Sequence, residues 1–551
     1  MTAFSSKAFG RAVPILIGVL LLVRLAAMTV VPLMDTTEAR YGEIGRKMAE
    51  LSDWVTPWFD YGVPYWGKPP LAFWLTAISF DIFGVNEFAA RLPHLIVSLA
   101  IIGLVAWMAR RRNPEAAWPA VVCISAAPVF FISAGAVLTD IELTFASTLA
   151  MTGFWIALER GPMTGSDRRS GLQSRSLASL LFFGGLVVGM LAKGPVAWVL
   201  AGVPIVLWTA YTSRWRDVWC SLPWIRGVVL TLVISLPWYL IAEGRTPGFL
   251  HYFLVGEHFH RFFTPGWHGD LYGNTHPSAF GAIWVFATID LLPWSVLLPI
   301  AAWRWRTPGA TLTAMFTSTA KAVTGGLSRR PVEVGYDKMR WQSYLLLWAF
   351  TPLLLFTPAR NVGWTYVLPG IPAAAILAGQ WLTAQARKGR NINSILCVGP
   401  LLMLGLIFVA AIPWLQPATM ERKSTKGLLA AYARPLSEQA TASAAGLPDL
   451  KPAKTTLPLI FVRRRPFSAE FYTRGQAILV ADANEAWSRI GAGAAYVATS
   501  NSDVFLAAAG DSKADEIGDE GGHMGSNQLA RRTVHRIGRY GKFDLLFVDA
   551  L

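Results

Sequence analysis

Charged side chains are scarce in this sequence of 551 residues: Asp, Glu, Lys and Arg together make up only 15% of it. A soluble domain carries about 25% charged residues. Hydrophobic residues account for 53%, among them 24 Trp and 30 Phe. A charge deficit of this size excludes intrinsic disorder and an ordinary cytosolic enzyme, and it indicates that lipid surrounds much of the protein.

Cysteine is also rare. Only Cys123, Cys220 and Cys397 occur, each in or beside an apolar stretch, and there is no Cys-x-x-Cys pair. This argues against structural disulfides and against a cysteine-based zinc site. The sequence also lacks Walker, Rossmann and kinase motifs, so we do not expect a nucleotide to supply the energy for a reaction.

Long apolar runs are present instead, and runs of about 17 to 25 residues mark membrane-spanning helices. The predicted spans are 12–33, 89–109, 117–138, 141–158, 177–193, 195–212, 222–242, 278–303, 341–357, 363–384 and 393–415. A shorter run over 71–85 carries Asp81 and is predicted to be a re-entrant or interfacial helix. The expected fold class is a polytopic α-helical membrane protein with about 11–13 transmembrane helices.

The charges that do occur are mostly basic, with a net charge of +15 and a pI near 9.8. Such an excess indicates nucleic-acid binding in a soluble protein and cytoplasmic loops in a membrane protein. Cations gather in loops that lie on one side of the predicted topology, at 110–112, 159–176, 304–340 and 387–390. We therefore predict a bacterial inner-membrane protein with a cytoplasmic N-terminus and no nucleic-acid partner.

The composition changes near residue 416, which divides the chain into a transmembrane domain, 1–415, and a C-terminal domain, 416–551. Strand-length apolar runs occur at 457–462, 477–480, 494–498 and 543–548. Helix-like stretches lie between them at 468–472 and 484–490, so we predict a small α/β domain. An odd number of spans would place this domain in the periplasm, together with the long loops 34–88 and 243–277.

Carboxylates stand out in the loops of the predicted outer face. From Glu38 to Leu51 apolar residues recur every three or four positions, which predicts an amphipathic helix on the membrane surface. Asp35 and Glu38 would lie at its positive N-terminal end, where the simpler interpretation is a capped helix with ordinary acids. Asp140 lies in a short turn between two spans, where an acid is costly unless it has a partner or a role.

Cations accompany these acids on the same face. Lys68 precedes two prolines, which hold its backbone extended. Such a lysine suits a phosphate, and it equally suits a lipid headgroup. The other outer cations are Arg40, Lys193 and Arg261. Acids suit a general base and cations suit a phosphate leaving group, so we hypothesise chemistry on a phosphorylated lipid.

Six short motifs occur in an order that resembles a known family. They are 38–44 (EARYGEI), 67–71 (GKPPL), the turn at Asp140, Lys193-Gly194, 257–262 (EHFHRF) and 365–369 (TYVLP). Over roughly residues 10–415 the chain resembles the aminoarabinose transferase family. These are polyprenyl-phosphate-sugar glycosyltransferases of the GT-C fold, related to protein O-mannosyltransferases.

The resemblance implies transfer of a sugar from an undecaprenyl-phosphate carrier to lipid A or another envelope glycolipid or protein. It also implies an inverting displacement, in which an acid of the first loop activates the acceptor and Asp140 lies nearby. The residues implied in carrier-phosphate binding are Lys68, Arg261, Lys193 and Tyr366. The residues implied in lining the substrate cavity are Arg40, Tyr41 and His258.

Two positions depart from the family pattern. Thr37 stands where the family commonly has Asp, so Asp35 is the predicted base and Glu38 the second choice. Gly67 stands where a metal-binding Glu is often found, which leaves His258 as a weak metal ligand and a divalent cation only as an option. A different class of function, a transporter or flippase for a lipid-linked sugar, would place ionisable groups within the spans instead.

Overall fold

A computed structural model describes residues 2–35, 37–159, 168–273, 277–305, 331–412, 416–433, 457–511 and 533–550. The chain divides into two compact units. The helical unit comprises Met1–Val30 and Lys47–Ile407, and the C-terminal unit comprises Val31–Arg46 and Phe408–Leu551. The start of the first long loop therefore groups with the C-terminal domain rather than with the spans.

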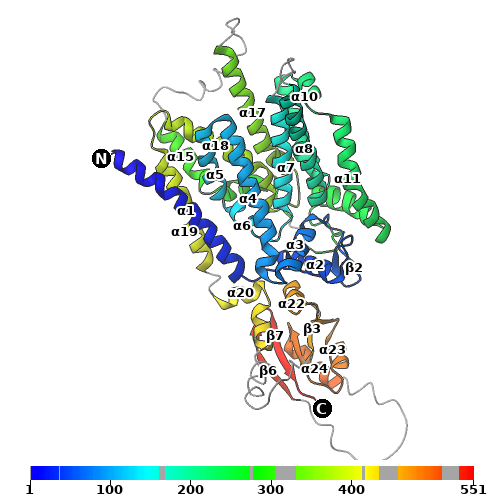
Figure 1. The fold of residues 1–551 in the computed structure, drawn as a ribbon. Helices are drawn as coiled ribbons and strands as arrows, with labels where there is room; N and C mark the ends of the chain where they lie inside the picture. Colours follow the sequence, from blue (N-terminus) through cyan, green and yellow to red (C-terminus); the bar gives the residue numbers. More distant parts are fainter. Residues whose placement is uncertain are drawn as a thin grey trace, which may run out of the picture. The chain divides into compact units, whose positions relative to one another are not determined.

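The helical unit is built almost entirely from helices (Figure 1). Its helices before the second long loop are α1 (Thr2–Val30), α3 (Leu71–Phe83), α4 (Glu87–Arg112), η1 (Pro114–Ala116), α5 (Ala117–Ser125), α6 (Pro128–Ser133), α7 (Asp140–Glu159), α8 (Arg168–Lys193), α9 (Val196–Thr212), α10 (Trp215–Ser221) and α11 (Trp224–Arg245). The later helices are α12 (Phe249–His251), η2 (Tyr252–His260), α13 (Arg261–Phe263), α14 (Ala282–Asp290), α15 (Trp294–Arg304), α17 (Pro331–Phe356), η3 (Trp364–Gly370), α18 (Ile371–Ala386) and α19 (Ile392–Ala411). A two-stranded ribbon, β1 (Trp58–Asp60) and β2 (Val63–Pro64), lies in the first long loop.

Seven helices of the described residues are long and apolar enough to cross a membrane, or eight if the bent pair α14 and α15 is one span. This confirms a polytopic helical membrane protein, with fewer spans than the eleven to thirteen expected. The difference arises because several apolar runs form short or broken helices. The run 117–138 forms α5 and α6, which are interrupted before Pro128. Helix α9 has 17 residues, and α14 and α15 meet at 77°.

Helix α7 lies at the centre of the helical unit, and nearly all of its residues are buried. A Cβ added at Gly153 of α7 would lie 2.5 Å from the backbone nitrogen of Phe182 in α8. A Cβ at Gly185 of α8 would lie 2.7 Å from the carbonyl oxygen of Ala146 in α7. The two helices therefore touch backbone to backbone, as small residues permit in membrane proteins.

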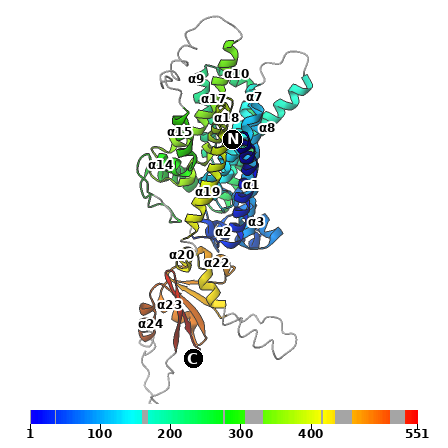
Figure 2. The same cartoon turned by 90° about the vertical axis from the view of Figure 1, so that its left-hand side faces the viewer.

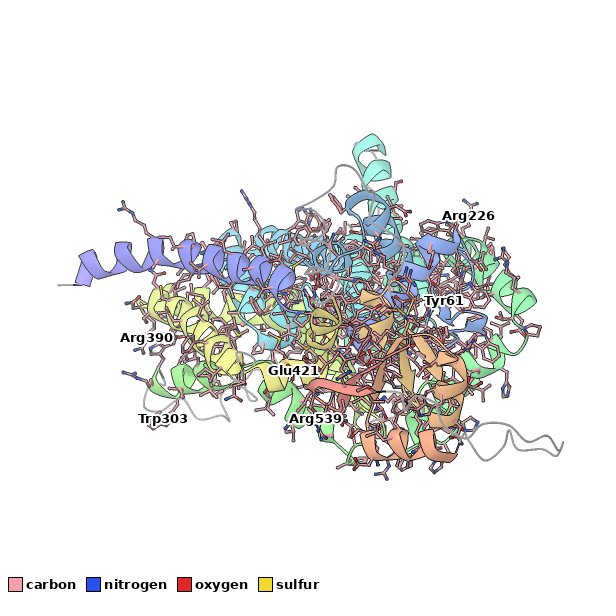
Figure 3. All side chains as sticks on the ribbon, turned by 90° about the horizontal axis from the view of Figure 1, so that it is seen from below. Tyr61, Arg226, Trp303, Arg390, Glu421 and Arg539 are labelled. Carbon is pink, nitrogen blue, oxygen red and sulfur yellow. The ribbon has the colours of Figure 1, made fainter. Side chains whose placement is uncertain are left out.

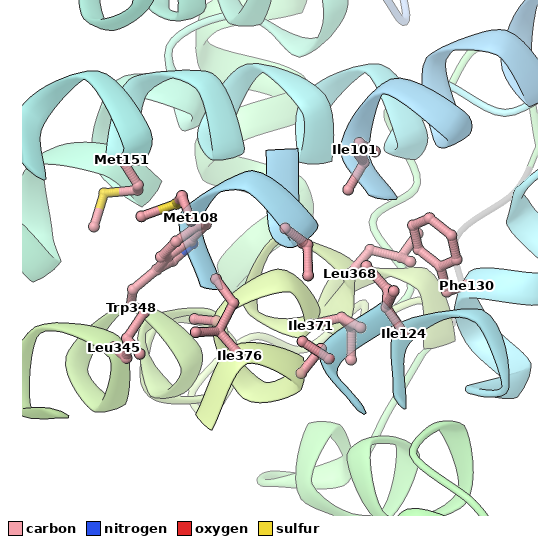
Figure 4. Packing of buried hydrophobic residues seen from close by; sticks show 14 of the residues in the cluster. Ile101, Met108, Ile124, Phe130, Met151, Leu345, Trp348, Leu368, Ile371 and Ile376 are labelled. Atoms are coloured by element: carbon pink, nitrogen blue, oxygen red, sulfur yellow. The ribbon is translucent and has the colours of Figure 1, made fainter. Parts of the chain in front are cut away.

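Large side chains fill the rest of this core (Figure 4). Met151 of α7, Met108 of α4 and Trp348 of α17 pack together. The indole nitrogen of Trp348 donates to the carbonyl of Pro369, 2.9 Å away, so this buried polar group is satisfied. Trp303 of α15 lies at the outer surface of the unit and is 69% exposed, as expected for a side chain that faces lipid (Figure 3).

Helix α2 (Thr37–Leu51) forms where the sequence predicted one, and it runs from the C-terminal unit into the helical unit. Its place on the membrane surface stays a prediction, and of its predicted apolar face only Leu51 is exposed, at 45%. The apolar side chains of Tyr41, Ile44 and Met48 are at most 6% exposed. Protein therefore covers most of the apolar face of α2.

The C-terminal unit contains a mixed five-stranded sheet in the order β4-β3-β5-β7-β6, and the helices labelled α22, α23 and α24 in Figure 2 belong to the same unit. The strands are β3 (Leu459–Val462), β4 (Ile478–Val480), β5 (Ala495–Thr499), β6 (Val534–Tyr540) and β7 (Phe543–Val548). Strand β3 is parallel to β4 and β5, whereas β7 is antiparallel to β5 and β6. This confirms the predicted α/β domain.

Helices cover both faces of this sheet. They are α20 (Pro417–Lys423), α22 (Phe467–Tyr472), α23 (Ala483–Ile490) and α24 (Ser502–Asp511), together with helical residues 426–433. Helices α23 and α24 cover one face, where Ala486 and Phe505 are fully buried. Helix α22 and residues 426–433 cover the other face, through Ala469 and Leu428.

Candidate functional site

A cavity of about 550 Å³ lies within the helical unit. This volume suits a small-molecule site. Its polar side chains come from five separate parts of the chain: Lys68, Asp140, Lys193, Glu257, His258, Arg261, Asn361 and Tyr366. Apolar side chains form the rest of the wall. Five of the residues predicted as catalytic or phosphate-binding therefore line one cavity, together with His258.

Lys68 reaches the cavity from the start of α3. Its ammonium nitrogen lies 2.7 Å from Oε2 of Glu257, and it also donates to the carbonyl of Gly67. The two prolines that follow Lys68 restrict its backbone, so the ammonium is presented at one place. Lys68, for which the sequence left a phosphate and a lipid headgroup equally open, is thus a member of a largely buried ion pair.

Glu257 is the centre of the charged cluster. One guanidinium nitrogen of Arg261 lies 3.0 Å from its Oε1 and 3.1 Å from its Oε2. Burial would raise the pKa of Glu257, but the positive charges of Lys68 and Arg261 and their hydrogen bonds outweigh burial and lower the pKa to about 2. This carboxylate is therefore ionised at neutral pH. Sequence reasoning missed it, although an acid four residues before Arg261 in the same motif was a usable signal.

A second ion pair lies across the cavity. Lys193, at the last residue of α8, has its ammonium nitrogen 2.5 Å from Oδ1 of Asp140, at the first residue of α7. An acid at a helix N-terminus and a cation at a C-terminus are both favoured by the helix dipole. The same ammonium lies 4.8 Å from the ring centre of Tyr366, a cation–π distance.

His258 contributes a neutral ring to the wall. Its Nδ1 lies 2.8 Å from the carbonyl oxygen of Phe253, and burial lowers its pKa. In the described part of the chain no group of three or more His, Cys, Asp or Glu is arranged to hold a metal ion. With Gly67 in place of an acid, the described residues around the cavity do not fit a metal.

Asn361 holds in place the chain segment that carries Arg261. Its side-chain nitrogen donates to the carbonyl of Arg261 and to that of Thr264, 2.8 Å away. This positioning residue was also missed. Nothing in one sequence links Asn361 to a partner 100 residues away.

The other four predicted residues belong to the C-terminal unit. Asp35 accepts hydrogen bonds from the backbone nitrogen of Ser468, 3.0 Å away, and from its hydroxyl. Oε2 of Glu38 accepts from the backbone nitrogen of Met34. The guanidinium of Arg40 lies 5.3 Å from the ring centre of Tyr41. Asp35 and Arg40 thus contact the first turn of α22, through Ser468 and the ring of Phe467.

Burial raises the pKa of Asp35, although the hydrogen bonds from Ser468 oppose the shift. A raised pKa suits a general base, and it also fits a buried carboxylate that only anchors the first loop. The first turn of α22 supplies the donors, as helix N-termini do for anions. The geometry therefore gives Asp35 a structural role in addition to its predicted catalytic one.

The cavity as a whole suits an anion that carries an apolar chain. Three cations face two carboxylates, which leaves one positive charge in excess. The walls include Leu254, Phe259 and Phe263, and the two phenylalanines are 61% and 62% exposed. Positive charge beside exposed aromatic surface in a membrane protein favours a lipid with a phosphate group.

Comparisons with known proteins agree with this geometry. Residues 11–253 match the family described as dolichyl-phosphate-mannose-protein mannosyltransferase. The undecaprenyl phosphate-α-4-amino-4-deoxy-L-arabinose arabinosyl transferase of Edwardsiella ictaluri is 30% identical over 393 residues, which cover 69% of this chain and 62% of the relative. The enzyme of that name from Pseudomonas aeruginosa PAO1 is 28% identical over 420 residues, covering 72% and 65%. The matched regions thus span less than two thirds of these relatives' length.

A solved structure shows the same fold. The crystal structure of ArnT from Cupriavidus metallidurans bound to undecaprenyl phosphate superposes with a TM-score of 0.64 and covers 97% of both chains. Its sequence is 20% identical to this one. The apo structure of the same protein gives a TM-score of 0.63.

Proposed function

Because this chain is related to the aminoarabinose transferases, as its motifs predicted, we propose that it is a membrane glycosyltransferase that uses a lipid-phosphate-linked sugar. The donor would be a sugar on undecaprenyl phosphate, and the acceptor lipid A or another envelope glycolipid or protein. The observation that carries the proposal is the cavity, in which Lys68, Lys193 and Arg261 meet two carboxylates beside an apolar wall.

The chemistry follows from the charges. An acceptor oxygen attacks the anomeric carbon, the bond from that carbon to the phosphate oxygen breaks, and the configuration inverts. The donor is a phosphodiester with one negative charge, whereas the leaving phosphate monoester gains a second. Cations that contact this phosphate stabilise the transition state more than the ground state, which is the condition for catalysis.

The acceptor proton needs a carboxylate. Asp35 remains our predicted base, and Asp140 is the acid that lines the cavity beside Lys193. We place the cavity at the outer face of a bacterial inner membrane and the C-terminal domain in the periplasm, because the basic loops then lie in the cytoplasm. This topology supports an acceptor made of envelope components.

Reconstitution tests the function directly. Purified protein in lipid nanodiscs, supplied with undecaprenyl-phosphate sugars and envelope lipids, should yield a sugar-modified acceptor and free undecaprenyl phosphate by mass spectrometry. The wild type is compared with a Lys68→Gln/Arg261→Gln double variant, which should form no product. Movement of the lipid-linked sugar across liposomes without any transferred product would assign the chain to the transporters instead.

A pair of substitutions separates the two roles of Asp35. We expect Asp35→Asn to lower kcat by about 100-fold or more, the usual loss for a general base. Ser468→Ala removes one hydrogen bond to the carboxylate and keeps the base, so its kcat should stay within about threefold of wild type. Steady-state transfer kinetics measure both. Equal losses in the two variants would leave Asp35 a structural role only.

A further inference from the structure

Glu257 is bound to the same cations that the proposed function assigns to the carrier phosphate. Both of its oxygens are used, Oε2 by Lys68 and Arg261 and Oε1 by Arg261. Its side chain is only 5% exposed, whereas those of Lys68 and Arg261 are 15% and 20% exposed. An anion is thus already held by the two side chains that the incoming phosphate needs.

A buried carboxylate in this position is electrostatically necessary when the cavity holds no ligand. Two cations brought together in a poorly hydrated site repel each other and lose solvation. An anion between them compensates for both costs. Glu257 supplies that anion. The charge of Lys193 is balanced by a different carboxylate, that of Asp140. The phosphodiester of the donor has the same single charge as a carboxylate, the monoester product carries one more, and both present acceptor oxygens that suit a guanidinium.

We propose that Glu257 is an internal counter-ion that takes the place of the carrier phosphate and competes with it for Lys68 and Arg261. Carrier binding draws the two cations away from Glu257, and Glu257 recovers them when the undecaprenyl phosphate product leaves. The residue therefore lowers the affinity for the phosphate and speeds product release. This inference rests on the proposed function, because it takes its ligand from it.

A rival role predicts the opposite sign. If Glu257 only braces Lys68 and Arg261, and the phosphate uses their remaining donors, removal of its charge should disorder the cations and weaken binding. Arginine has five donors and lysine three, so both arrangements are chemically possible. Affinity measured in a variant without this charge separates competition from bracing.

The test measures binding of undecaprenyl phosphate to the purified full-length protein in nanodiscs, by surface plasmon resonance and by thermal stabilisation. Glu257→Gln, which keeps the shape of the side chain, should bind about tenfold tighter than wild type. Its temperature of unfolding without ligand should be lower and should rise further on adding ligand. In transfer assays kcat and KM should both fall, because release of the product becomes slower.

Glu257→Asp provides a second variant if the glutamine form does not fold. Its charge is retained on a shorter side chain, so its contacts with both cations weaken and its affinity should rise by a smaller factor. Unchanged or weaker binding in the folded variants, with wild-type binding intact, overturns the role of Glu257 and leaves the proposed function standing. A wild type that does not bind undecaprenyl phosphate at all overturns the proposed function itself.

Discussion

Replacement of Arg261 by Gln is expected to lower kcat/KM for sugar transfer by about 100-fold to 1,000-fold. The guanidinium lines the cavity and can offer two parallel N–H donors to one phosphate. The negative charge on that phosphate grows as the glycosidic bond breaks. Loss of a donor that acts on developing charge therefore reduces kcat, in addition to any weaker binding in KM.

Two further variants sharpen this prediction. Arg261→Lys keeps the charge but loses the planar fork, so an intermediate loss is expected. Arg360→Gln is the matched control. Arg360 is exposed, and its backbone nitrogen donates to the carbonyl of Phe262, the residue after Arg261. Its activity should stay within about twofold of wild type. Steady-state kinetics that give Arg261→Gln near-wild-type activity would remove Arg261 from the phosphate site.

Replacement of Asp140 by Asn is expected to lower kcat by about 100-fold. The neutral side chain leaves Lys193, whose side chain is only 12% exposed, without its anionic partner, and an uncompensated charge is costly where little water reaches it. The ammonium would then turn toward the phosphate and hold the product, or lose its position over the ring of Tyr366. Either change misplaces a cation that we propose contacts the carrier phosphate.

An exposed ion pair supplies the control for Asp140. Glu115 and Arg387 are 3.0 Å apart and more than 60% exposed, so Glu115→Gln should change stability by less than about 1 kcal/mol and leave transfer unchanged. Asp140→Asn, Lys193→Gln and the double variant form a thermodynamic cycle in kcat. Additive losses in that cycle would show that the two side chains act independently and would contradict the pairing.

The residues with strong local signals were predictable from the sequence. Cations are rare in the loops of the predicted outer face, which makes Lys68, Lys193 and Arg261 conspicuous. The structure brings all three to one cavity. Asp140 was predictable for the same reason, since an acid at the end of an apolar run needs a partner. The strands β3, β4, β5 and β7 are apolar enough to be found without a structure.

The site residues that the sequence did not reveal, Glu257 and Ser468, have partners that are distant in the chain. Glu257 looked like an ordinary acid until its distance to Lys68 was known, 189 residues away in sequence. Ser468 of α22 has no motif, and only the fold brings it to Asp35. Strand β6 was missed because its sequence, VHRIGRY, belongs to a largely exposed edge strand without a regular apolar alternation.

The backbone contact between α7 and α8 links the chemistry to a distant part of the membrane domain. Asp140 begins α7 and Lys193 ends α8, so their separation depends on how far one helix can slide along the other. Gly153 lies 13 residues from Asp140, about 20 Å along the helix, where the two backbones touch. A side chain larger than glycine at this contact would force α7 and α8 apart or along each other, and so would change the separation of Asp140 and Lys193. A larger side chain at Gly153 is therefore expected to disturb the ion pair in the cavity, although it contacts neither Asp140 nor Lys193.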